Sequence, residues 1–189
     1  MNLANKLTIL RVLLIPAFVL FLLWQFWGGN VLVAMLIFIG ASITDALDGN
    51  YARKHNLVTN FGKFLDPLAD KALVMSALVC FAALGWAGAV PVIIILFREF
   101  LVSALRMVAQ NASGKVIAAG TSGKLKTAFT MTAIIAILFF RGLMAAGVPL
   151  PENIVAIGGD ILIWIATALT AYSGAEYLIK NKDCIDPSK

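Results

Sequence analysis

The chain of 189 residues is 61% hydrophobic and only 13% charged, with a formal net charge of +5 and a mean hydropathy of +0.92. A soluble domain usually contains about 45–50% apolar and about 25% charged residues. The apolar excess is too large for one buried core, which excludes an ordinary soluble protein and predicts a single membrane domain, residues 1–189. No basic run is interleaved with aromatic residues, which argues against nucleic acid as a partner.

Six apolar segments are long enough to cross a bilayer, which takes about 20 residues in a helix. In chain order the predicted spans are 9–27, 31–52, 63–85, 89–109, 126–146 and 153–179. Stretches that contain glycine, proline and asparagine separate most of them, as expected for turns. The first span lacks a small-residue cleavage site, so we expect it to be retained and not cleaved as a signal peptide. The sequence therefore predicts an all-α, polytopic protein with six transmembrane helices.

An even number of spans places both termini on one side of the membrane. Every lysine and arginine except Arg98 and Arg141 falls on that side, in loops or near helix ends. Positive residues accumulate on the cytoplasmic side of membrane proteins, so we expect cytoplasmic termini. Because no transit peptide is recognisable, we expect a multi-pass protein of the cell (plasma or inner) membrane.

Four aspartates lie at the cytoplasmic edge of the second and third spans. Asp45 and Asp48 are three residues apart, and Asp66 and Asp70 four apart, so each pair shares one helix face. The loop between the spans is centred near residues 56–57, which puts both pairs at one depth. Each buried charge costs about 2.5–3.5 kcal/mol, so four facing carboxylates require cations. Oxygen ligands of this kind are typical of a site for Mg²⁺ or Mn²⁺, one ion or two. We expect this site between the helices, on the cytoplasmic side.

Other roles are open to the aspartates. They could form ion pairs with Arg53 or Lys71, or serve as a proton relay in a transporter, although charged residues in spans usually mark functional sites. Gly49 and Ala52 reduce side-chain bulk beside the aspartates, so that a flat ligand can approach the backbone. Arg53 adds a guanidinium group that can donate two hydrogen bonds to a phosphate. Taken alone, Gly49 and Ala52 are more typical of close helix packing.

These residues form one continuous pattern, Asp45-x-x-Asp48-Gly49-x-x-Ala52-Arg53, eight residues, Gly62-x-x-x-Asp66-x-x-x-Asp70. At every position it resembles the signature of the CDP-alcohol phosphotransferase family. The resemblance implies a six-helix homodimer in which the four aspartates bind a pair of divalent ions that hold the CDP diphosphate. It implies that Asp70 is the general base for the acceptor hydroxyl. It also implies that Asp45, Gly49, Ala52 and Arg53 contact the CDP-diacylglycerol donor.

Further cations occur at the same membrane side. Arg98 and Arg106 are two turns apart in the fourth span, and Lys115, Lys124 and Lys126 precede or open the fifth. So many cations favour an anionic acceptor, although the three lysines could instead anchor the protein at lipid headgroups. Arg98 is too deep to reach the surface easily, so we expect it to pair with Glu99 or face the cavity.

Residues 5–11, 98–106 and 123–127 resemble the phosphatidylglycerophosphate synthase branch of this family. That resemblance implies transfer of a phosphatidyl group from CDP-diacylglycerol to sn-glycerol 3-phosphate. It assigns to the glycerol phosphate five cations: Arg106, Lys124, Lys126, Arg98 and Lys115. Asn5, Thr8 and Arg11 could close the donor pocket, or Arg11 could anchor an interfacial helix together with Lys6. The last two spans look generic, although Tyr172 and Ser173 could reach the cavity.

Three alternatives remain. A sister enzyme would use inositol phosphate or serine as the acceptor. A divalent metal transporter would use the aspartates as its transport site, but the four carboxylates lie at one face and not at the midplane, and no inverted repeat is present. A lipid-binding scaffold would not require Asp70.

Overall fold

The computed structural model describes the chain except for residues 1–2, 25–26, 56–59, 114–119 and 182–189. Within the helices, side chains are described except at residues 3–8, 45–55, 60–67, 70 and 108–113. The described residues form six helices and no strand. They are α1 (Leu3–Leu23), α2 (Asn30–His55), α3 (Asn60–Ala83), α4 (Ala89–Ser113), α5 (Thr121–Ala145) and α6 (Glu152–Lys180). The all-α prediction with six helices is therefore confirmed.

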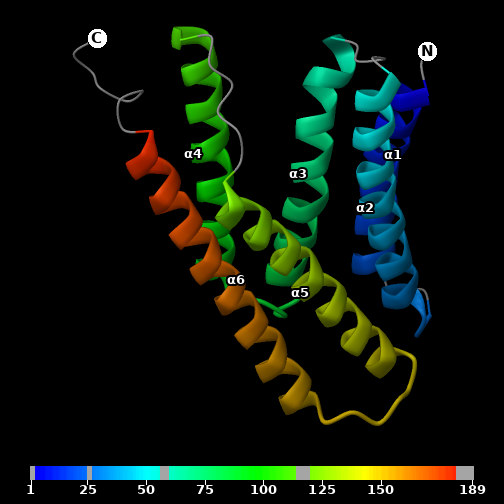
Figure 1. Cartoon of the computed structure of the whole chain (residues 1–189). Helices are drawn as coiled ribbons and strands as arrows, with labels where there is room; N and C mark the ends of the chain where they lie inside the picture. The colour runs from blue at the N-terminus through cyan, green and yellow to red at the C-terminus, as the bar shows by residue number, and fades with distance from the viewer. Residues whose placement is uncertain (1–2, 25–26, 56–59, 114–119, 182–189) are drawn as a thin grey trace.

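Successive helices alternate in direction along the bundle (Figure 1). As a result, the same end of the molecule contains the first residues of α1 and α3 and the last residues of α2, α4 and α6. We call this end the charged end, because it includes the aspartate segments of α2 and α3. The opposite end contains the turns that join α1 to α2, α3 to α4 and α5 to α6.

The helices contain 21 to 29 residues each, enough at 1.5 Å per residue to cross about 30 Å of hydrocarbon. Within the described residues, α5 and α6 are long and apolar enough throughout to span a membrane. In three other helices the apolar part is shorter, at Ile9–Leu23, Asn30–Thr44 and Lys71–Ala83. The polar remainder of these helices lies toward the charged end, where the aspartate pattern occurs.

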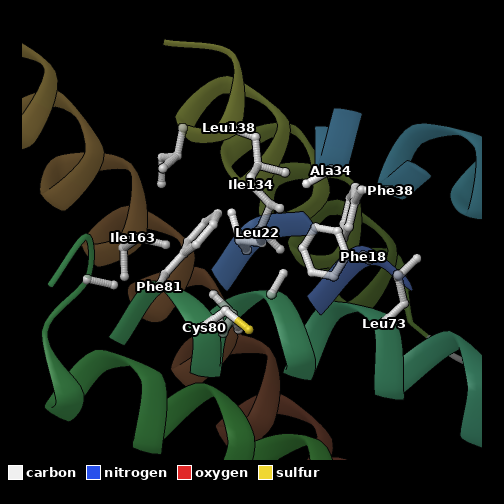
Figure 2. Packing of buried hydrophobic residues seen from close by; sticks show 14 of the residues in the cluster. Phe18, Leu22, Ala34, Phe38, Leu73, Cys80, Phe81, Ile134, Leu138 and Ile163 are labelled. Carbon is white, nitrogen blue, oxygen red and sulfur yellow. The ribbon is translucent and has the colours of Figure 1, made fainter. Parts of the chain in front are cut away.

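A core of aromatic and aliphatic side chains joins the helices (Figure 2). Phe18 of α1 and Phe38 of α2 are fully buried, with ring centroids 5.7 Å apart. Phe81 of α3, Leu138 of α5 and Ile163 of α6 are buried in the same cluster. The main helix pairs are α1 with α2 and α3, α5 with α2 and α6, and α4 with α6. The α4–α6 pair is the one that shapes the site described below.

Glycine terminates two helices at the end opposite the charged end. Gly85 after α3 and Gly147 after α5 have φ angles of +70° and +92°, which side chains with a Cβ rarely adopt. The next residue donates a backbone hydrogen bond back to the helix: Trp86 to Phe81 at 2.8 Å, and Val148 to Leu143 at 3.0 Å. This pattern is typical of helix ends and allows the chain to reverse in a few residues.

Candidate active site

The backbone places the aspartate pattern on two neighbouring helix ends. Asp45 and Asp48 lie in the last three turns of α2, and Asp66 and Asp70 in the first three turns of α3. The two helices run antiparallel, lie side by side at the charged end and contact each other (Figure 1). The expected juxtaposition of the two segments is therefore present at the level of the backbone.

Several predicted site residues lie outside the described side chains. The structure gives the helical position but no described side chain for Asn5, Thr8, Asp45, Asp48, Gly49, Ala52, Arg53, Asp66 and Asp70. Lys115 lies wholly outside the described residues. No group of three or more metal-ligating side chains occurs among the described ones. The aspartate pattern stays the metal-binding set predicted from the sequence.

Arg11 is the described member of the predicted donor pocket. Its side chain is 1% exposed, although arginine is among the residues least often buried. It lies on α1, which packs against both aspartate-bearing helices, α2 and α3. An interfacial anchor would place the guanidinium of Arg11 among lipid headgroups, where it would be exposed. Its burial instead suits a position inside the bundle, as expected at the donor pocket.

A pocket of about 170 Å³ opens between α4, the start of α5 and the end of α6. Arg98 and Arg106, two of the cations predicted to bind the acceptor phosphate, both line it. The Arg98 guanidinium donates hydrogen bonds to Glu99 Oε1 at 3.1 Å and to Ser173 Oγ at 2.8 Å. The Arg106 guanidinium lies over the Tyr177 ring, 5.6 Å from the ring centroid. Two guanidinium groups in one small pocket form a site suited to an anion.

Lys126 lies elsewhere in the same region. Lys126 is buried, and its ammonium group donates a hydrogen bond to Glu99 Oε1. Together with Lys71 and Glu99 it lines a second, smaller cavity of about 40 Å³ between α3, α4 and α5. The predicted contact of Lys126 with the glycerol phosphate is neither confirmed nor contradicted by this position. The structure adds a role as the partner of Glu99.

A polar network connects four helices through this region. Lys71 of α3 donates a hydrogen bond to Ser103 of α4, whose hydroxyl donates to the Glu99 backbone carbonyl at 2.6 Å. Glu99 in turn accepts from Lys126 of α5, and Arg98 reaches Ser173 of α6. Hydrogen bonds between helices stabilise membrane bundles and here fix the cationic side chains. Lys71, the α3 member of the network, directly follows Asp70 in the sequence.

Three expectations for individual residues can be compared with the structure. Ser173 reaches the Arg98 pocket as predicted, but Tyr172 does not: it is 67% exposed and faces away. The expectation for Tyr172 was wrong, because successive residues of a helix point about 100° apart. Lys124 is exposed in the first turn of α5, next to Gly123, which does line the pocket.

Glu99, Gly174 and Tyr177 were not singled out as site residues from the sequence. Polar residues four apart on an apolar helix, as at Ser173 and Tyr177, are the signal that could have indicated the inward face of α6. The requirement for glycine at position 174 depends on a contact with Arg98 of another helix, so the residues around position 174 in the sequence do not reveal it.

The comparisons with known proteins agree on one family. Residues 1–172 match the family model described as CDP-alcohol phosphatidyltransferase. The match ends directly before Ser173, so the inward-facing residues at the end of α6 lie beyond it.

Relatives with established names match nearly the whole chain. The chain is 42% identical to the CDP-diacylglycerol–glycerol-3-phosphate 3-phosphatidyltransferase of Bacillus subtilis (strain 168), over 99% of this chain and 98% of that protein. It is 40% identical to the protein of the same name from Rickettsia bellii, over 93% of each chain. It is 37% identical to a probable phosphatidylglycerophosphate synthase of Mycobacterium tuberculosis (strain H37Rv), over 95% of this chain and 81% of that protein.

Proposed function

The chain belongs to the CDP-alcohol phosphatidyltransferase family, and from this premise we propose that it transfers the phosphatidyl group of CDP-diacylglycerol to sn-glycerol 3-phosphate. The products are phosphatidylglycerophosphate and CMP. The full-length similarity to enzymes with that name supports the reaction. The observation that carries the choice of acceptor is the pocket in which Arg98 and Arg106 lie together, because a phosphorylated alcohol needs such a site and serine does not.

The aspartates suit the metal dependence that the family resemblance implies. Four carboxylates on two adjoining helix ends form a donor set of hard oxygen atoms, and Mg²⁺ and Mn²⁺ prefer such oxygens. Asp45, Asp48, Asp66 and Asp70 would hold one or two divalent ions. A bound ion would neutralise charge on the diphosphate of the donor.

The protein's own residues then divide the remaining work. Arg98 and Arg106 bind and orient the phosphate of the acceptor, so that its free hydroxyl points toward α2 and α3. Asp70 takes the proton from that hydroxyl as the oxygen attacks the β-phosphorus of CDP-diacylglycerol, the phosphorus that carries the diacylglycerol. The bond to CMP breaks, and CMP leaves with the electron pair. Gly49, Ala52 and Arg53, with Asn5, Thr8 and Arg11, contact the donor.

The membrane arrangement follows from the same helices. We propose that the 189 residues are one domain whose six helices all cross the bilayer. Each helix has the length to do so, and α1 to α4 add their polar turns at the charged end. The bias of lysine and arginine toward that end favours a cytoplasmic site and cytoplasmic termini. In accordance with the family resemblance, we propose that the protein is a homodimer.

A lipid-product assay on the purified protein tests the function. CDP-diacylglycerol is supplied with Mg²⁺ or Mn²⁺ and with one of four acceptors: sn-glycerol 3-phosphate, inositol phosphate, serine or unphosphorylated glycerol. We expect phosphatidylglycerophosphate and CMP with glycerol 3-phosphate alone, and no turnover in EDTA. Product with inositol phosphate or serine would show a sister enzyme and refute the acceptor. No transfer, combined with Mg²⁺ or Mn²⁺ flux into vesicles, would indicate a transporter instead.

A further inference from the structure

The end of α6 presents three buried residues to α4. Ser173, Gly174 and Tyr177 are buried, whereas Tyr172 before them and Ala175 between them are exposed. The α4 residues opposite are Arg98 and Arg106, the two arginines of the pocket. We propose that this face of α6, which we call the arginine seat, is a positioning element: it fixes both guanidinium groups where they bind the acceptor phosphate. The proposal rests on the proposed function and extends it to α6.

The first half of the seat holds Arg98. Ser173 Oγ accepts a hydrogen bond of 2.8 Å from the Arg98 Nη2 group. Beside it, a Cβ added to Gly174 would lie 2.8 Å from Cγ of Arg98, closer than carbon atoms approach without displacement, and 3.6 Å from its Nε. The absence of a side chain at position 174 therefore gives Arg98 its path across α6. Glu99 Oε1, at 3.1 Å, fixes the guanidinium from the α4 side.

The second half of the seat holds Arg106. Tyr177 is 8% exposed, and the face of its ring supports the Arg106 guanidinium at 5.6 Å, a geometry in which the ring quadrupole attracts the cation. Arg106 is itself exposed, so the ring limits the orientations of an otherwise mobile side chain. Residue 177 is about one helical turn from both 173 and 174, so one face of one helix positions both cations.

Both arginines and two seat residues, Ser173 and Tyr177, line the pocket of about 170 Å³. That volume is many times the roughly 10–15 Å³ needed by one water, so a small phosphate ester can enter. Because the described contacts of the seat on α4 are with the two arginines, its loss should weaken binding of the acceptor and leave binding of the donor unaffected. This selectivity distinguishes a positioning role from a general role in folding.

Two glycines of the same helix provide a matched test. Gly174→Ala adds one methyl group against Arg98, while Gly158→Ala adds the same group where nothing lies within 4 Å. We expect Gly174→Ala to raise the KM for sn-glycerol 3-phosphate about 10- to 100-fold, with the KM for CDP-diacylglycerol within about twofold of the unsubstituted protein. Gly158→Ala should leave both unchanged. Equal KM values for the acceptor in the two variants, or equal increases for both substrates, would overturn the proposal.

The tyrosine provides a second test that holds even if Gly174→Ala does not fold. Tyr177→Phe keeps the ring and should preserve the KM for the acceptor within about twofold, whereas Tyr177→Leu removes the ring and should raise it about fivefold or more. An unchanged value in Tyr177→Leu would argue against the seat.

Binding of inorganic phosphate, measured by calorimetry in the presence of Mg²⁺, separates the two proposals. If the unsubstituted protein transfers to no acceptor, the proposed function fails. The seat is then supported by phosphate affinity that is at least about tenfold weaker in Gly174→Ala than in Gly158→Ala. It is refuted by equal affinity or by no binding.

Discussion

Lys126 of α5 donates a hydrogen bond to the carboxylate of Glu99 of α4. The same carboxylate oxygen also accepts a hydrogen bond from Arg98, so one anion serves cations from two helices. The side chains of Glu99 and Lys126 are only 15% and 8% exposed, which leaves little solvent to screen them. Glu99 is therefore the counter-ion that allows two cations to lie close together within the bundle.

Removing this counter-ion should destabilise the protein. Glu99→Gln keeps the shape but leaves Arg98 and Lys126 without their shared anion, and we expect a loss of about 3 kcal/mol in the free energy of unfolding. Denaturant unfolding in detergent micelles measures it. Glu99→Asp, which keeps the charge, should lose less. Adding Lys126→Met to Glu99→Gln should restore part of the loss, because one of the two cations that shared the Glu99 carboxylate is then gone. A double variant no more stable than Glu99→Gln would contradict this account.

Asp70 should be required for the chemical step, whereas donor binding should depend on it less, because the other three aspartates can still hold a metal ion. Asp70→Asn cannot accept the proton of the acceptor hydroxyl, so we expect a rate about 10²- to 10⁴-fold lower in single-turnover release of CMP. Binding of CDP-diacylglycerol should persist. Asp160→Asn is the matched control, because Asp160 is exposed on α6 outside the pocket. A rate for Asp70→Asn within tenfold of the control would exclude Asp70 as the general base.

Close packing of α2 on α5 should depend on Gly142. A Cβ at this position would lie 2.5 Å from Cδ2 of Leu32 and 3.3 Å from its backbone nitrogen, so α2 as well as the leucine side chain would have to shift. We expect Gly142→Ala to lower the free energy of unfolding by about 1–3 kcal/mol. Gly40→Ala is the control, because nothing lies within 4 Å of a Cβ there. It should be neutral or stabilising by up to about 1 kcal/mol, since alanine favours helix more than glycine. Equal stability of the two variants would refute the packing argument.

The membrane arrangement can be tested by cysteine labelling in intact cells. In a protein with Cys80→Ala and Cys184→Ser, Val148→Cys introduces a thiol in the exposed turn between α5 and α6. A membrane-impermeant maleimide should label it from outside. With Cys80→Ala alone, Cys184 in the C-terminal tail should react only after lysis. Labelling of both from outside would refute the proposed six crossings, and the reverse pattern would refute the orientation.

Much of the fold could be predicted because its signal is local. Each apolar segment of sufficient length corresponds to one helix. At the charged end the helices nevertheless extend beyond the predicted spans: α1 begins at Leu3 and not at residue 9, and α5 at Thr121 and not at 126. At the opposite end α1 was predicted too long, because it ends at Leu23 and not at residue 27. Hydropathy reports the part of a helix that suits lipid, whereas the backbone continues its hydrogen bonds into the polar turn beyond it.

The site could be predicted only in part, because part of it depends on contacts between distant residues. The aspartate pattern is contained in one short stretch, and the sequence therefore reveals it. The pairing of Lys126 with Glu99 joins residues 27 apart, and that of Arg98 with Ser173 joins residues 75 apart. Which side of α6 faces α4 is decided by that packing. For this reason Ser173 was predicted correctly and its neighbour Tyr172 was not.

The order of the helices along the chain has a consequence for biosynthesis. The aspartate segments belong to α2 and α3, which leave the ribosome early, whereas the residues that hold Arg98 and Arg106 are at the end of the last helix. A nascent chain with five inserted helices would already possess its four carboxylates but no wall behind the two arginines. If the arginine seat acts as proposed, acceptor recognition is the last property to form, and an unfinished chain in the membrane would be unable to select its acceptor.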